Sequence, residues 1–293
     1  MVRKPKGQKR PGNAMGAAIK VATDEAIEEF NDEGNTVRDP HVKALHYRIE
    51  HAETVMYESP KPLRHEEAGF TVQLEDSRAV IEMKDHHPSR ESAREAVEGF
   101  LSAWELKSAL ESGQDSLQFT YERADMIDRN PEPGVVVLYA EAAQVAIQGG
   151  DVSFRMNLTS FPPPPTDMAV DADVEFLFAI YQMFRQGTRT LSDAAYLSLT
   201  VLERRFRGAK DTRKAAAQHF GIDKNVLINI GKLTGEKGGL TARKAKGIEN
   251  KYTAAESQFL QSAMTTIIRR ASEVAYDPGA NKIKITLADL PQI

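Results

Sequence analysis

Six polar side chains between residues 213 and 232 have the types and spacing that most clearly suggest a binding site. Lysine and arginine donate hydrogen bonds and carry positive charge, whereas asparagine both donates and accepts. Such groups suit the phosphates and base edges of DNA or RNA, so the stretch predicts contact with a nucleic acid. The predicted contact residues are Arg213, Lys214, Lys224, Asn225, Asn229 and Lys232.

The residues around them predict two short helices joined by a tight turn. Ala217 is a small residue where the helices would cross, and Gly221 follows four positions later, where a left-handed backbone costs glycine least. Asp223 is suited to cap the second helix. This register resembles the helix-turn-helix motif of repressor-type DNA-binding proteins. The apolar residues expected to pack inward are Phe220, Ile222, Leu227 and Ile230.

Other features of the second helix argue against DNA reading. Ile228 lies among its outward polar residues and is expected to be buried, and Gly231 weakens the helix by roughly 1 kcal/mol relative to alanine. Arginine, the usual reader of guanine, is missing from that helix. A purely structural helical hairpin is the simpler explanation of the same residues, and the sequence leaves both open.

The flanks of the stretch are strongly basic. Residues 204–251 hold 13 lysines and arginines against four acidic residues, whereas residues 21–169 hold 13 against 29. The cations of this region could bind phosphates, but they would not distinguish one base from another. A solvated lysine-rich face would have the same composition. The flanking cations are Arg204, Arg205, Arg207, Lys210, Arg243, Lys244 and Lys246.

Arg213 and His219 allow a second interpretation. With five residues between them they resemble the arginine–histidine motif of HEPN-type ribonucleases, which also lies in a small helical bundle. The resemblance implies that the two residues act on the 2′-hydroxyl and the scissile phosphate of RNA. Here Lys214 and three alanines follow the arginine, where that family normally has a polar residue. A partly buried histidine at a helix end is the alternative.

Two other groups of residues could hold a metal ion. If residues 44–57 form one strand, His46 and His51 point to opposite faces about 16 Å apart and cannot share an ion. Glu82 and Lys84 resemble half of the restriction-type nuclease motif, whose upstream acid would have to be Asp76 in a turn. A cross-strand ion pair is the ordinary explanation of these two residues, so no metal and no cofactor is predicted. The clustered histidines are His41, His46, His51, His65, His86 and His87.

The elements that position these residues predict an α+β fold. An N-terminal, mostly antiparallel sheet domain with one covering helix is followed by a C-terminal all-helical domain. Strands are predicted within 44–58, 69–75, 78–84, 116–127, 134–142 and 152–161, with a hairpin at Asp76-Ser77. The covering helix is expected to begin at Ser89 or Ser92 and to bury Trp104.

The chain divides into four predicted parts. These are a basic tail with an amphipathic helix (1–40), the α+β domain (41–160), a stiff proline-rich linker (161–167) and the helical domain (168–293). In the last part, 173–184 is apolar nearly all round and should be central, and Thr253–Glu256 form a capping box. The strand-like tail 282–293 is expected to dock on the N-terminal sheet.

Composition and charge give three functional hypotheses. The chain has no cysteine, which excludes disulfides and thiolate metal sites and fits a reducing, cytoplasmic location. Its longest apolar stretch, 134–147, is too short to span a bilayer, so no membrane partner is expected. The sequence predicts a non-catalytic nucleic-acid-binding protein whose acidic N-terminal domain senses or assembles with a protein partner. A HEPN-type ribonuclease or a protein-only adaptor subunit are the alternatives.

Overall fold

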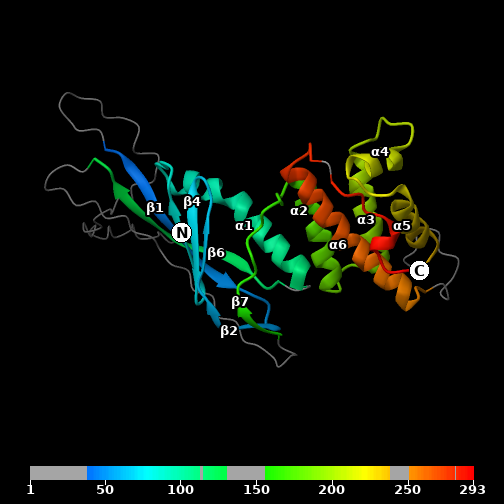
Figure 1. Ribbon diagram of the computed structural model, residues 1–293, viewed down its shortest axis with the longest axis horizontal. Helices are drawn as coiled ribbons and strands as arrows, with labels where there is room; N and C mark the ends of the chain where they lie inside the picture. Colours follow the sequence, from blue (N-terminus) through cyan, green and yellow to red (C-terminus); the bar gives the residue numbers. More distant parts are fainter. Residues whose placement is uncertain (1–37, 113–114, 131–155, 238–250, 281) are drawn as a thin grey trace, which may run out of the picture.

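The computed structural model describes residues 38–112, 115–130, 156–237, 251–280 and 282–293. In these ranges an antiparallel sheet is followed by a group of helices (Figure 1), as the predicted α+β class requires. Two predicted elements, the helix near residues 13–30 and the strand at 134–142, lie outside the described residues. The basic residues Arg243, Lys244 and Lys246 do as well.

The main sheet has five antiparallel strands in the order β3-β4-β5-β1-β6. The predicted turn at Asp76-Ser77 joins β4 to β5, and Asp76 has a positive φ of 51° there, which aspartate tolerates better than most residues. The apolar residues of each strand lie mainly on one face, which the long helix after β5 covers. The strands are β1 (Pro40–Glu50), β3 (Leu63–Glu66), β4 (Phe70–Glu75), β5 (Arg78–Met83) and β6 (Gln118–Asp128).

The stretch predicted as one strand at 44–58 is divided between two sheets, so that prediction was wrong. Strand β1 ends at Glu50, and β2 (Val55–Lys61) pairs in parallel with β7 (Met156–Ser160). The break follows from backbone hydrogen bonds: the Ala52 amide donates to the carbonyl of Asp115, and the Ala52 carbonyl accepts from Val55. Residues 51–54 therefore turn the chain away from β1.

Helix α1 (Arg90–Ser112) is shared between the two halves of the molecule (Figure 1). It begins after Ser89, whose Oγ accepts from the amide of Ser92 at 3.2 Å, as an N-cap does. Trp104 is fully buried in the sheet core. Ala103 and Leu106, on another side of the same helix, belong to the core of the helical half.

The proline-rich segment predicted as a linker at 161–167 packs along α1. Phe161 is buried in the sheet core. The Trp104 indole Nε1 donates to the carbonyl of Pro162 at 3.0 Å. Lys107 Nζ donates to the carbonyls of Pro163 and Pro164 at 3.3 and 3.0 Å. Prolines have no amide hydrogen, but their carbonyls accept, and α1 uses these to hold the segment in place.

The helical half is built around one apolar core. The α2 segment, predicted to be central, is buried on one side only, since the side chains of Phe176 and Met183 are 45% and 44% exposed. The Thr253–Glu256 capping box at the start of α6 is present as predicted. The helices are α2 (Ala172–Arg185), α3 (Leu191–Arg204), α4 (Thr212–His219), α5 (Lys224–Glu236), α6 (Ala254–Tyr276) and the short 3₁₀ helix η3 (Leu287–Asp289).

The C-terminal tail docks on the turn between α4 and α5 and not on the N-terminal sheet, which corrects that prediction. Ile285 donates its amide to Gly221 at 2.9 Å and accepts from Asp223 at 2.7 Å, giving a one-residue parallel bridge with Ile222. Leu290 is buried in the helical core. The tail therefore forms hydrogen bonds with backbone groups of the turn. Across the described ranges, every helix is too short or too polar to cross a membrane.

Candidate nucleic-acid interface

Helices α4 and α5 and the turn between them have the geometry that the sequence predicts. Gly221 has a φ of +59°. The amides of Gly221 and Ile222 donate to the carbonyls of Gln218 and Ala217, the two bonds of a Schellman motif that ends a helix. Asp223 then caps α5 by accepting from the Asn225 amide at 2.8 Å. Ala217, the small residue expected at the helix crossing, is buried, and so are the residues expected to pack inward, Phe220, Ile222, Leu227 and Ile230.

A buried arginine from α6 holds this turn. The guanidinium group of Arg270 donates to the carbonyls of Phe220 and Gly221 at 3.3 and 3.4 Å, and to that of Ile283 in the tail at 2.8 Å. Its Nε lies 2.8 Å from a carboxylate oxygen of Glu273, which balances the buried charge. The turn, α6 and the tail are thereby fixed to one another, and with them the start of α5.

The outward side of α5 carries Asn225, Ile228, Asn229 and Lys232, which are half-buried or exposed. Their spacing of three, four and seven residues from Asn225 places them on one face of the helix. Ile228 is 37% exposed, so the prediction that it is buried was wrong. Its helical phase explains the difference, since it stands three residues after Asn225 and four before Lys232, in line with the polar residues and not with Leu227 or Ile230.

Two of the six predicted contact residues are held by acidic partners. Arg213 Nε donates to Glu203 at 2.6 Å, and both side chains are partly buried. Lys224 Nζ donates to Asp211 at 2.6 Å. That hydrogen bond, followed by one from the Lys214 amide, lowers the pKa of the Asp211 carboxyl below its usual value. These two cations are therefore less available to a ligand than their types suggest.

Lys214 and Lys232 are exposed and form no ion pair with another described residue. Lys214 lies at the rim of a shallow open hollow on α4, which Lys210, Thr212 and Gln218 also line. Asp211 lies there too, as the cap of α4. Lys210 and Arg207 are exposed in the segment before α4. Lysines of this kind are the ones that phosphates could reach without breaking an internal contact.

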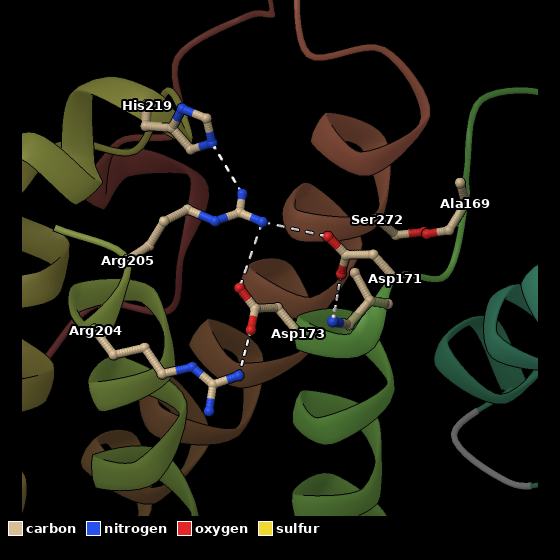
Figure 2. A network of polar contacts seen from close by, with 8 residues as sticks. Ala169, Asp171, Asp173, Arg204, Arg205, His219 and Ser272 are labelled. Atoms are coloured by element: carbon tan, nitrogen blue, oxygen red, sulfur yellow. Dashed lines mark hydrogen bonds and ion pairs between the residues drawn. The ribbon is translucent and has the colours of Figure 1, made fainter.

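The cations at the end of α3 are engaged within the protein. Figure 2 shows Arg205 between the carboxylates of Asp171 and Asp173, at 3.4 and 3.5 Å, and the ring of His219. Arg204 forms an ion pair with Asp173. The count of basic residues in 204–251 therefore overstates the charge that an external anion would meet, because α2 supplies carboxylates from outside that range.

Arg213 and His219, the pair that resembles the ribonuclease motif, have separate surroundings. Arg213 lies against Glu203 and Gly231. The His219 ring packs against Phe206 and Phe220, and its Nε2 accepts from Arg205 at 3.3 Å. Burial, followed by the charge of Arg205, lowers the pKa of His219 below its usual value of 6.5. No hydrogen bond joins Arg213 to His219 in the described part of the chain.

The acidic and histidine groups of the sheet do not form a metal centre within the described residues. Asp76 and Glu82 stand near opposite ends of β5, on the order of 20 Å apart along the strand. Lys84 Nζ donates to the carbonyl of Glu67 at 2.6 Å. Each clustered histidine has its own neighbour: His46 bonds to Asp125, His65 stacks on Phe100, His51 meets Tyr57, His87 bonds to Ser92, and His41 stacks on His86.

Comparisons with protein-family models, with curated proteins and with solved structures found no match to this chain.

Proposed function

We propose that this chain is a non-catalytic cytoplasmic protein that binds nucleic acid through α4 and α5, with its acidic N-terminal part serving assembly with a protein partner. The observation that carries the proposal is the outward face of α5, where amides and a lysine lie together beside a turn of helix-turn-helix geometry. Both helices lie at the end of the molecule away from the sheet (Figure 1), where a long, stiff ligand meets no obstacle from the sheet.

The cations divide into those that would contact phosphates directly and those that would have to be released. Lys214 and Lys232 are in the first group. Lys224 forms an exposed pair with Asp211, and exposed pairs contribute little to stability, so a phosphate could replace the carboxylate at small cost. The Arg213–Glu203 pair is more buried, and removing Arg213 from it would leave Glu203 without its partner. Arg213 is therefore assigned a structural role.

The test is binding of the full chain to a fluorescent DNA duplex of about 20 base pairs as the salt concentration is raised. Each phosphate contact contributes about 0.9 to the slope of log affinity against log salt. The Lys214→Ala/Lys232→Ala variant should bind more weakly and with a shallower slope. Lys61→Ala/Arg78→Ala removes the same charge from exposed positions on the strands β2 and β5, and should behave as wild type. Absence of binding to this duplex and to RNA at ~50 mM salt, where binding should be near maximal, would exclude the proposal.

The exposed apolar face of α2, which lies in the helical half and not in the acidic N-terminal part, is a second surface suited to a protein partner. Phe176 and Met183 are seven residues apart, so they lie on the same side of the helix, and the guanidinium of Arg204 lies over the Phe176 ring at 5.5 Å. Exposed aromatic and methionine side chains are enriched where proteins associate. If this face binds a partner, replacing both residues by serine should abolish the complex without lowering the affinity for DNA. An unchanged complex would assign the contact elsewhere.

A further inference from the structure

One apolar side chain stands in the otherwise polar outward face of α5. Val226, Leu227 and Ile230 of the same helix are fully buried, whereas Ile228 remains 37% exposed between Asn225 and Lys232. Together with Asn225 and Asn229, this isoleucine forms a mixed surface. The isoleucine can make apolar contacts, and each asparagine amide can form two hydrogen bonds at once.

These side-chain types match one kind of base pair. In the major groove an asparagine can bond to both N7 and N6 of adenine, and an apolar side chain can contact the C5-methyl group of thymine. Guanine is read mainly by arginine, and α5 contains none. Lys232 is a flexible single charge, better suited to a phosphate than to a fixed pattern of acceptors.

The spacing of the residues agrees with the spacing of bases. Asn225 and Asn229 are four residues apart, which is about 6 Å along a helix. Base pairs are stacked about 3.4 Å apart, so the two amides span roughly two steps of the duplex. Ile228 lies between them along the helix. The three side chains can therefore address neighbouring base pairs and need no bend in the helix.

We infer that the Asn225–Ile228–Asn229 face reads adenine–thymine pairs in the major groove of duplex DNA. The inference rests on the proposed function, which requires only that α4 and α5 contact a nucleic acid, and it adds the class of ligand and the residues that choose it. Double-stranded RNA is excluded as the preferred ligand, because its major groove is too deep and narrow for side chains to read.

The experiment selects duplexes bound by the full chain from a random DNA library at moderate salt. The bound pool should be enriched in adenine–thymine pairs over at least two adjacent positions. The best selected duplex is then compared with a copy in which uracil replaces thymine, which removes only the C5-methyl groups. Wild type should bind the uracil copy several-fold more weakly, whereas Ile228→Ala should bind both copies equally.

Asn229→Ala tests the amide separately. It should lose on the order of tenfold in affinity for the selected duplex and keep its affinity for a guanine–cytosine duplex of the same length. Asn157→Ala, on β7, removes an amide far along the chain from α5 and should leave both affinities unchanged. Alanine favours a helix at both tested positions, and circular dichroism verifies that each variant is folded.

The outcomes separate the two proposals. A bound pool with the composition of the input, bound with the usual salt dependence, overturns the inference and leaves nucleic-acid binding intact. Selection of adenine–thymine pairs that Ile228→Ala and Asn229→Ala do not alter overturns the assignment to α5. Tighter binding to double-stranded RNA overturns the choice of groove. No binding to any DNA or RNA, duplex or single strand, overturns the proposed function as well.

Discussion

The guanidinium group of Arg213 lies against Gly231, so close that a Cβ atom on residue 231 would come within 3.1 Å of two of its nitrogens. Glu203 holds that guanidinium from the other side at 2.6 Å. The glycine that weakens α5 in the sequence thus provides the space in which an ion pair links α3, α4 and α5. Here a local cost in helix propensity is offset by a tertiary contact.

Replacing Gly231 by alanine should therefore change stability little in the wild-type protein. The gain in helix propensity, about 1 kcal/mol, is opposed by displacement of Arg213 from Glu203. In an Arg213→Ala background the opposition disappears, and Gly231→Ala should then stabilise by nearly the full amount. Urea denaturation of the four proteins measures the coupling; additive effects of the two substitutions would show that the close approach has no energetic consequence.

Gly221 and Gly187 offer a matched comparison for the turn between α4 and α5. Both end a helix with a Schellman motif at positive φ, +59° and +73°. A Cβ on Gly187 would meet nothing within 4 Å, whereas one on Gly221 would lie 2.9 Å from an Arg270 nitrogen. Gly187→Ala should cost about 1 kcal/mol for the left-handed backbone alone. Gly221→Ala should cost clearly more, because Arg270 must also leave the carbonyls that it binds.

Equal losses for the two variants in urea denaturation would mean that Arg270 moves without penalty. In that case Arg270 would not hold the turn rigidly. Unequal losses of stability, with weaker DNA binding by Gly221→Ala than by Gly187→Ala, would show that the contacts of Arg270 with the turn help to position α5.

His219 should make stability depend on pH below neutrality. Its pKa is lowered, first by burial and then by Arg205, so the unfolded chain takes up a proton before the folded protein does. The contribution of neutral His219 to the free energy of unfolding is complete above pH 6.5, the pKa of the histidine in the unfolded chain. It is lost as the pH falls from there toward the lower pKa of the folded protein. His219→Gln should flatten this part of the curve in urea titrations between about pH 7.5 and 5.

His41 has a lowered pKa from burial and from Arg129, so a smaller slope of the same sign should remain in that variant. His51→Gln removes an exposed imidazole outside these surroundings and serves as the control. A wild-type slope retained in His219→Gln would contradict the assigned surroundings of the ring.

The sequence predicts those features whose causes are local. The Asp76-Ser77 turn, the Asp223 cap and the Thr253 capping box each depend on residues within a few positions of one another. Gly221 belongs with them, because a helix end requires its backbone conformation. Ile228 could have been placed correctly as well, since its spacing from Asn225 and Lys232 puts it on the polar face.

What the sequence does not predict depends on partners far along the chain. Asp171 and Asp173 neutralise Arg204 and Arg205 from more than 30 residues away, so a count of charges in one window counts cations that are already paired. The tail was assigned to the wrong surface for the same reason. A short strand-like segment pairs with whichever backbone groups are left unsatisfied, and these belong to the turn after α4.

The sharing of α1 between two cores should make the protein unfold as one unit. Leu101 faces the sheet core and Leu106 the helical core, both nearly inaccessible to solvent. Truncating either to alanine should cost about 2–5 kcal/mol. Trp104, the single tryptophan, reports the sheet core by fluorescence, and circular dichroism reports mainly the helices. Both signals should shift together in urea for both variants. A Leu106→Ala variant that lowers the dichroism midpoint but not the fluorescence midpoint would show that the halves unfold separately, and that α1 transmits no stability between them.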